Sequence, residues 1–203
     1  MVGPVQFLVA GFVAQGAWRT PYNWAANQVS DLGAVHCGST GPDNPPARYV
    51  CSPLHEVFNG SAIALGVLFA AGVIALGSAW GRGAVSWASR VLLVLSGMGM
   101  VLAGGRPEDV DLNTHVLGAF LIFAMGSAGV LLAGFVPRAG RIGGLRALTL
   151  PLGIASMVAT WLMFTHHTVG LGPGGMERVA LWTLLGWAAA TGLRACRWRR
   201  ASA

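Results

Sequence analysis

Six apolar segments alternate with short polar segments along the 203 residues of the chain. A helix that crosses the roughly 30 Å hydrocarbon core of a bilayer needs about 20 apolar residues, and the second to fifth segments approach or reach this length. The pattern therefore predicts an all-α membrane protein, a six-helix bundle in one domain over residues 1–203. The expected spans are residues 4–18, 57–79, 84–104, 116–136, 147–165 and 179–196.

The first apolar segment, Val5 to Trp18, is short for a membrane span. A secretory signal peptide would carry basic residues before its apolar core and a small-x-small cleavage site after it. This segment has no basic residue before it and no clear cleavage site. We therefore expect a span that is tilted or lies in a locally thinned bilayer, and a start codon placed too late would also explain the short length.

The charged residues are divided unevenly between the segments that separate the apolar runs. All seven acidic residues and all five histidines lie in the first, third and fifth of these segments or at the adjoining helix ends. The second, the fourth and the C-terminal tail carry nine arginines and no acid. Arginine is enriched on the cytoplasmic side of membrane proteins. We therefore expect a multi-pass protein of the cell membrane with both termini cytoplasmic and the loop 19–56 outside.

Composition excludes two other classes of protein. The chain is 54% hydrophobic and 10% charged, whereas a soluble domain averages about 25% charged residues. The net charge of +6 could indicate nucleic-acid binding, but the arginines flank apolar segments and do not line one helix face, so we expect membrane lipids and no nucleic acid as partners. The sequence leaves the oligomeric state open.

The long first loop contains Cys37 and Cys51, on either side of a segment rich in proline and glycine at residues 41–46. In an oxidising compartment, two cysteines in one loop favour a disulfide. The alternative is two free thiols.

Two polar clusters flank the start of the second span. Asp31 lies in an Asn-Gln-Val-Ser-Asp-Leu-Gly stretch, where it either caps a short helix or points into a pocket between helices. His55 and Asn59 are four residues apart and share a helix face. An amide in an apolar span is costly unless it is paired, so we expect Asn59 to form a hydrogen bond to another helix.

Two further clusters lie at the same end of the bundle. Glu108 and His115 belong to a stretch with three carboxylates at the outer ends of the third and fourth spans. His166 ends the fifth span, and Glu177 and Arg178 begin the sixth after a glycine-rich loop. We expect Arg178 to pair with a carboxylate there or to bind an anionic head group.

No segment carries a strong catalytic motif, so three hypotheses follow from the clusters alone. The first is a protein whose polar outer mouth binds a lipid head group or a small molecule. The second is a metal-assisted lipid hydrolase or transferase, in which His115 and His166 would hold a divalent ion such as zinc. The third is that the polar residues only cap and join helices. The candidate ligand-binding residues are Asp31, His55, Asn59, Glu108, His115, His166, Glu177 and Arg178.

At these motifs the chain resembles the domain of unknown function 998 family of bacterial and archaeal membrane proteins. The resemblance covers nearly the whole chain and implies a six-helix bundle, but it supplies no reaction. The chain departs from the family pattern in an insert at residues 36–51 and in the doubled His166-His167. The matching residues are Asn27-x-x-Ser30-Asp31-Leu32-Gly33, Ser52-Pro53, Phe58-Asn59, Gly105-x-Pro107-Glu108, His115 and Glu177-Arg178.

Overall fold

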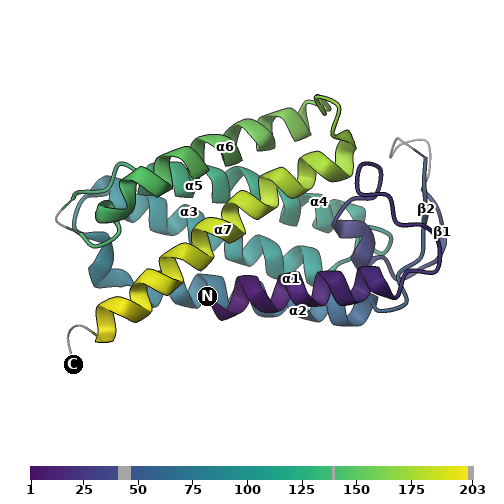
Figure 1. The fold of residues 1–203 in the computed structure, drawn as a ribbon, viewed down its shortest axis with the longest axis horizontal. Helices are drawn as coiled ribbons and strands as arrows, with labels where there is room; N and C mark the ends of the chain where they lie inside the picture. Colours follow the sequence, from purple (N-terminus) through teal and green to yellow (C-terminus); the bar gives the residue numbers. More distant parts are fainter. Residues whose placement is uncertain (41–46, 139, 201–203) are drawn as a thin grey trace.

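The computed structural model describes residues 1–40, 47–138 and 140–200 and is mainly helical, as the sequence predicts. Long helices run side by side along one axis, and loops gather at both ends (Figure 1). The predicted segment 41–46, which includes Asp43, lies outside the described residues. The helices are α1 (Val2–Gly16), α2 (His55–Ala75), α3 (Ala84–Gly105), α4 (Leu112–Phe120), α5 (Gly126–Ala133), α6 (Arg146–Phe164) and α7 (Gly172–Arg200).

Five helical segments of the described chain are long and apolar enough to cross a membrane. One of them is continuous from Leu112 to Ala133, because the π-helical segment η3 (Leu121–Met125) joins α4 to α5. The predicted second to sixth spans therefore have their counterparts. The N-terminal helix α1 has only 15 residues, which corresponds to about 22 Å at 1.5 Å per residue.

One helix boundary differs clearly from the prediction. Helix α7 begins at Gly172 rather than at residue 179, so the glycine-rich stretch that we expected to be a loop forms its first turn. Pro173 suits this place because the first helical position needs no N–H donor. A Cβ atom at Gly174 would lie 2.0 Å from the backbone oxygen of Asn27. These glycines therefore let the start of α7 pack directly on the loop that follows α1.

Small residues bring the helices close together. Gly66 on α2 faces Gly97 on α3, and Gly99 on α3 faces Gly118 on α4, at distances that leave no room for a side chain. Close backbone approach at small residues is a common way for membrane helices to associate, because lipid offers no hydrophobic drive between them. The α2–α3–α4 layer is therefore held by contacts between backbones.

Buried hydroxyl groups link the remaining helices. Ser127 on α5 contacts Ser156 at 2.8 Å and Thr160 at 2.9 Å, both on α6. Ser96 on α3 donates a hydrogen bond of 3.0 Å to the carbonyl of Ile122, in the π-helical segment. The Ile122 carbonyl also accepts a backbone hydrogen bond at the end of this segment, so the Ser96 hydroxyl adds a link between α3 and the π-helical wall.

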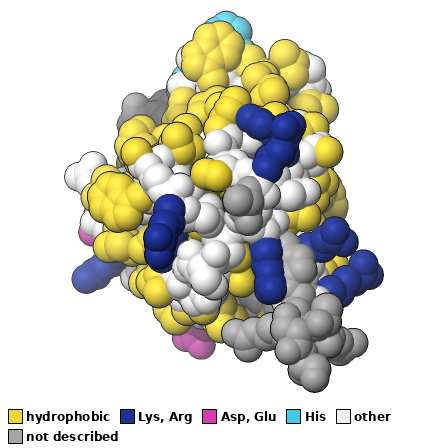
Figure 2. Space-filling model, turned by 90° about the vertical axis from the view of Figure 1, so that its left-hand side faces the viewer, with side chains coloured by type: hydrophobic (Ala, Val, Ile, Leu, Met, Phe, Trp, Pro, Cys, Tyr) yellow, Lys and Arg dark blue, Asp and Glu magenta, His cyan; other side chains and the backbone are white. Residues whose placement is uncertain are grey.

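The two ends of the bundle differ in charge. At one end lie the connections between α2 and α3, with the 3-10 turn η2 (Gly77–Trp80), and between α5 and α6, with η4 (Gly143–Leu145). Figure 2 shows arginine side chains spaced around this face. The other end carries the acidic residues that the structure describes, and we call it the acidic end. There, the 3-10 turn η1 (Ser30–Gly33) and the two-residue strands β1 (Gly38–Ser39) and β2 (Tyr49–Val50) form a cap.

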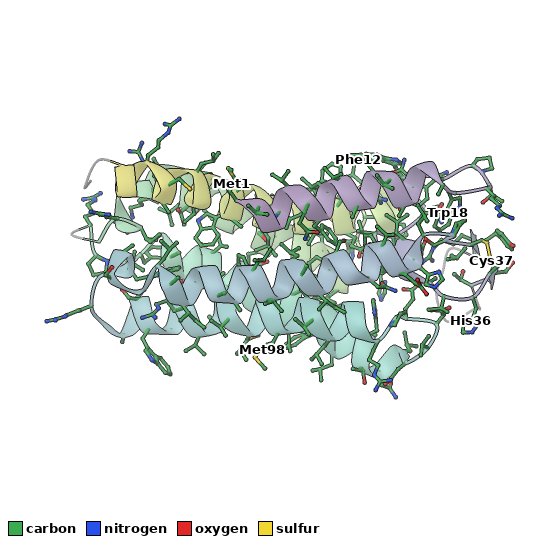
Figure 3. The ribbon with its side chains drawn as sticks, turned by 90° about the horizontal axis from the view of Figure 1, so that it is seen from below. Met1, Phe12, Trp18, His36, Cys37 and Met98 are labelled. Atoms are coloured by element: carbon green, nitrogen blue, oxygen red, sulfur yellow. A yellow bond between two sulfur atoms is a disulfide. The ribbon has the colours of Figure 1, made fainter. Side chains whose placement is uncertain are left out.

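The strands pair antiparallel, with Gly38 opposite Val50. A disulfide joins Cys37 to Cys51 immediately beside this pairing, at the tip of the cap (Figure 3). A covalent bond therefore closes the base of the hairpin and holds the β2 residues Tyr49 and Val50 in place within the cap.

We expect Gly66→Ala to destabilise the protein, because its Cβ atom would lie 2.4 Å from the carbonyl oxygen of Gly97. Overpacking of this kind costs about 1–3 kcal/mol. Gly72→Ala is the matched control on the same helix, since nothing lies within 4 Å of a Cβ atom there. Thermal unfolding in detergent measures both variants. Equal midpoints for the two would show that the α2–α3 contact is not as close as described.

Candidate functional site

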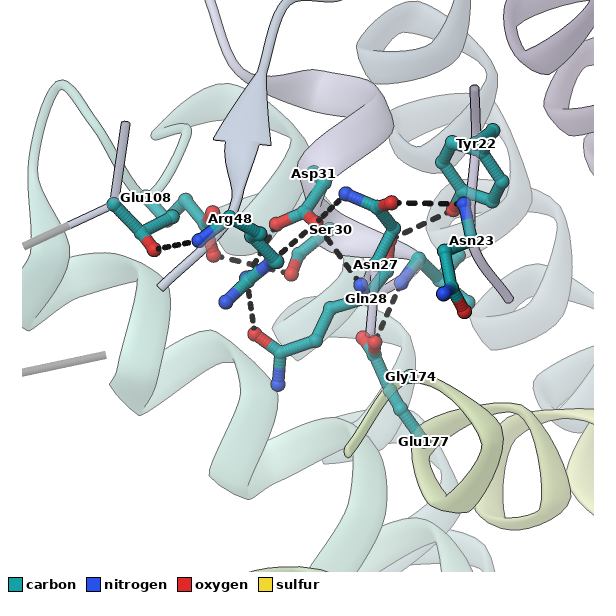
Figure 4. Close-up of polar contacts among 12 residues, drawn as sticks. Tyr22, Asn23, Asn27, Gln28, Ser30, Asp31, Arg48, Glu108, Gly174 and Glu177 are labelled. Atoms are coloured by element: carbon teal, nitrogen blue, oxygen red, sulfur yellow. Dashed lines mark hydrogen bonds and ion pairs between the residues drawn. The ribbon is translucent and has the colours of Figure 1, made fainter. Parts of the chain in front are cut away.

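The residues that join α1 to the first hairpin strand fold over the acidic end of the bundle and carry a dense polar network (Figure 4). Asp31 is at its centre and is completely buried. Its carboxylate accepts hydrogen bonds from the Asn27 side chain and from the backbone N–H of Gln28, each 3.0 Å long. These bonds fold the loop around its own acidic residue.

Arg48 provides the charge that balances Asp31. Its Nε atom donates to Asp31 Oδ2 at 2.7 Å, and its Nη2 atom donates to Asp31 Oδ1. The Arg48 side chain also donates to Gln28 Oε1 at 2.8 Å and is 92% buried, with 8% of the residue exposed. A two-pronged arginine–carboxylate pair fixes orientation as well as distance. It holds strand β2 against the η1 turn.

Sequence reasoning did not identify Arg48. Its signal was its position, as one of few basic residues in the acidic segments of the chain. Asp31 was expected either to cap a helix or to face a pocket, but the η1 turn has no side-chain cap. The carboxylate forms an internal ion pair instead.

Arg178 also has internal partners, which are carbonyls, a hydroxyl and aromatic rings rather than the carboxylate that we considered, and the head-group alternative stays a prediction. Its Nη1 atom donates to the backbone carbonyls of Trp24, Asn27 and Gly174. Its Nη2 atom donates to the Tyr22 hydroxyl, and the guanidinium lies over the rings of Tyr22 and Trp24. Arg178 therefore anchors the loop to α7.

Glu177, the neighbour of Arg178, is bound in a different way. Its Oε2 atom accepts a hydrogen bond from the backbone N–H of Val29, and the residue is only 7% exposed. The other oxygen, Oε1, has no hydrogen bond to any described part of the chain, and the side chain lines a cavity beneath the loop. This carboxylate therefore has acceptor capacity on the cavity side.

The cavity lies between α1, α2, α3, α4, η3 and α7 and has a volume of about 70 Å³. One water molecule needs roughly 10–15 Å³ of such volume, so the space exceeds that of a single water. Its deep walls are apolar, and they include Phe7, Leu65, Met100 and Phe123. The polar residues that line it are Ser30, Asn59, His115 and Glu177.

Two of these lining residues are partly used inside the protein. Asn59 donates from Nδ2 to the carbonyl of Gly33 at 2.8 Å, which is the pairing expected for an amide in an apolar helix. His115 Nδ1 lies 3.2 Å from the carbonyl of Ala103 and 3.0 Å from that of Arg106. These carbonyls fix the ring at the start of α4, and the Asn59 Oδ1 atom keeps acceptor capacity.

Glu108 borders the same network from the connection between α3 and α4. Its Oε2 atom accepts a hydrogen bond of 3.1 Å from the Ser30 hydroxyl. Burial, together with the nearby charge of Asp31, raises the pKa of Glu108 to about 8. Glu108 is therefore largely protonated at neutral pH, although Arg48 nearby opposes the shift.

Two predicted site residues belong neither to the lining of this cavity nor to the network above it. His55 begins α2, and its Nδ1 atom lies 2.9 Å from the carbonyl of Ser52. His166 follows the end of α6 and is exposed, with a φ angle of 58°. Of the predicted residues, the structure thus places Asn59, His115 and Glu177 around the cavity, with Asp31, Glu108 and Arg178 in the network above it.

The donor set does not fit the metal centre that we considered. No group of three or more histidine, cysteine, aspartate or glutamate residues within the described ranges could hold a metal ion. His115 is engaged with backbone carbonyls, and His166 lies outside the cavity lining. A resident zinc ion usually has at least three protein ligands, so we derive no chemistry from a metal here.

We expect Arg48→Met to destabilise the protein strongly, because it leaves the Asp31 carboxylate buried and unpaired. Breaking a buried pair in this way costs about 3–5 kcal/mol. The double variant Asp31→Leu with Arg48→Met is the control and should regain much of the loss, because neither charge then stays buried alone. Thermal unfolding and proteolysis of the loop measure both effects. Equal loss in the double variant would contradict an ion-pair origin.

We expect the stability of the protein to depend on pH through Glu108. Because its folded-state pKa of about 8 exceeds the ordinary value of 4.5, its contribution is complete below about 4.5 and is lost as the pH rises through about 8. Glu108→Gln should flatten the fall in unfolding temperature across this range. The control is Glu56→Gln, at an exposed position in the first turn of α2; a slope that Glu108→Gln leaves unchanged would contradict the assignment.

Comparison with known proteins gives one match. No curated protein and no solved structure matches the chain. A family model described as "Protein of unknown function (DUF998)" matches residues 1–194, which is nearly the whole chain and includes every residue of the network and the cavity. This chain is therefore a membrane protein that belongs to the DUF998 family.

Proposed function

We propose that the protein binds an amphiphilic small molecule or lipid, with the head group at the polar side of the cavity beneath the loop. The observation that carries this proposal is the cavity itself, which combines apolar walls with the nearly buried carboxylate of Glu177. Ligand sites are typically concave and mostly apolar, with a few convergent polar groups that fix orientation. The cavity of this chain likewise combines mostly apolar walls with a few polar groups.

The chemistry of the polar residues indicates the kind of head group. Glu177 Oε1 and Asn59 Oδ1 are acceptors, and the Ser30 hydroxyl already donates to Glu108. A hydroxyl or amine head group would supply the matching donors. The volume of about 70 Å³ suits a short apolar group or the end of a chain between Leu65, Met100 and Phe123.

A local feature of the backbone supports a binding role at this position. Ile122 and Phe123, which line the cavity, belong to the π-helical segment η3. Single π turns within α-helices occur frequently at functional sites, because they move side chains away from regular helical positions. Here the π turn lies in the wall of the cavity.

We further propose that the chain spans the membrane six times, with α1 as a short first span and the arginine-rich end in the cytoplasm. Unbalanced arginines at one end of the bundle support this orientation. The polar network and the cavity mouth then lie at the extracytoplasmic face of the cell membrane. A bound molecule would be drawn from the outer leaflet or from outside the cell.

A purely structural role is the second candidate, and it has specific support for part of the predicted site. Asp31 and Arg48 form an ion pair with each other, and Arg178 donates to carbonyls within the protein. We assign these three residues to the stability of the loop rather than to a ligand. Glu177 differs from them because it lines the cavity and one of its oxygens has no hydrogen-bond partner in the described chain.

We expect Ala119→Phe to abolish ligand binding, because Ala119 lines the cavity and a phenyl ring would fill much of its volume. Native mass spectrometry of protein released from mild detergent, followed by lipid extraction, measures the bound molecule. Ala155→Phe is the matched control, since Ala155 is exposed on α6 and lies away from the cavity lining.

Glu177→Gln tests the head-group contact separately, because it keeps the shape of the side chain and replaces one carboxyl oxygen with an NH2 group. We expect the ligand to be retained less well than in the wild type. A bound molecule that is unchanged in Ala119→Phe, or no bound molecule in the folded wild type, would favour the structural role.

A further inference from the structure

A second, larger cavity lies in the other half of the bundle, between the start of α1, α2, η2 and α7. Its volume is about 240 Å³. Met1 packs against Gly192 beside it, and Figure 3 shows Met1 partway along the bundle, with α7 continuing past it toward the arginine-rich end. Most of its walls are apolar, including Leu68, Phe69 and Val73 on α2.

Two residues that line this cavity each carry a buried polar atom without a hydrogen-bond partner within the described chain. These atoms are the indole Nε1 of Trp80 and the hydroxyl Oγ1 of Thr191. Trp80 is 1% exposed and Thr191 is 4% exposed. A buried donor that stays unsatisfied destabilises the folded chain. Trp80 in particular can only donate, so its natural partner is an oxygen acceptor.

The charges nearby favour an anionic acceptor. Arg82 follows Trp80 by two residues, and Arg194 follows Thr191 by three, which places it on the same side of α7 one turn further along. Both arginines are exposed. The acidic residues that the structure describes all lie at the opposite end of the bundle, so no carboxylate of the described chain competes for this region.

We propose that this cavity binds one anionic phospholipid from the leaflet at the arginine-rich end. One acyl chain lies along the apolar wall of α2. Ester or phosphate oxygens accept hydrogen bonds from Trp80 and Thr191, and the phosphate lies toward Arg82 and Arg194. This site is separate from the cavity beneath the loop, and it depends on the protein lying in a membrane but not on the orientation proposed above.

Water alone satisfies this cavity poorly. A buried water molecule typically makes about three hydrogen bonds to protein, whereas a cavity of this size has two unsatisfied side-chain atoms among mainly apolar groups. A phospholipid matches both parts of the lining, because its chain is apolar and its glycerol region carries several acceptors. Inorganic phosphate would match the arginines but leave the apolar wall uncovered.

Gly72 allows the cavity to be filled without disturbing the fold. It lines the cavity, and nothing lies within 4 Å of a Cβ atom at this position. Gly72→Phe should therefore place its ring in the space of the acyl chain. Gly60→Phe is the matched control on α2, since it is equally open and lies toward the acidic end of the same helix.

The experiment is native mass spectrometry and thermal unfolding of the full chain in detergent, titrated with phosphatidylglycerol, phosphatidylcholine or inorganic phosphate. We expect one phosphatidylglycerol to bind and raise the unfolding temperature of the wild type and of Gly60→Phe. We expect this binding to be lost in Gly72→Phe. The same phosphatidylglycerol binding in Gly72→Phe would overturn the proposal, as would equal stabilisation by phosphatidylcholine or by phosphate alone.

Thr191→Val tests the hydrogen bond while keeping the volume of the side chain. We expect it to weaken phosphatidylglycerol binding roughly fivefold, the effect of losing one neutral hydrogen bond. Thr183→Val is the control, because the Thr183 hydroxyl bonds to carbonyls of its own helix. Equal affinity in Thr191→Val and Thr183→Val would overturn the assigned contact.

Discussion

The arrangement of the acidic end depends on the ion pair between Asp31 and Arg48. Both side chains are withdrawn from water, and a pair of this kind is stable only when geometry and additional hydrogen bonds offset the loss of hydration. Asn27 and Gln28 supply those bonds. The pair closes a loop that otherwise has little regular structure, and so it determines where Val29 and Ser30 meet the helices beneath them.

Helix α7 is attached to this loop through two adjacent residues with different roles. Arg178 is saturated by carbonyls and aromatic rings of the loop, whereas Glu177 uses one oxygen on the loop and turns toward the cavity. The loop is thereby attached to the helix, while the second carboxyl oxygen of Glu177 has no hydrogen-bond partner in the described chain. A carboxyl group that a core would normally exclude lies beside apolar walls, and this combination distinguishes the cavity from the close-packed helix contacts elsewhere.

Apolar run length was sufficient to predict the long helices, because spans of about 20 apolar residues have few alternatives. It failed at Gly172, where packing of glycines against the loop extends α7 through a stretch that resembles a flexible connection. The site was predicted in part. Asn59, His115 and Glu177 stood out as polar residues at apolar helix ends, but Arg48 did not, since its partner is set by loop folding. Histidines such as His166 gave the same local signal without lining the cavity.

The π-helical turn at Leu121–Met125 sets the rotation of α5 relative to α4. Because each residue of an α-helix turns the chain by about 100°, a single residue removed from this turn would swing residues 126–133 to a different azimuth. Ser127 would then leave Ser156 and Thr160, and Gly129 would leave Leu93. The number of residues in this helix is thus fixed by its contacts on both sides of the π turn. Chains that share its packing should therefore tolerate substitutions along it far better than insertions or deletions.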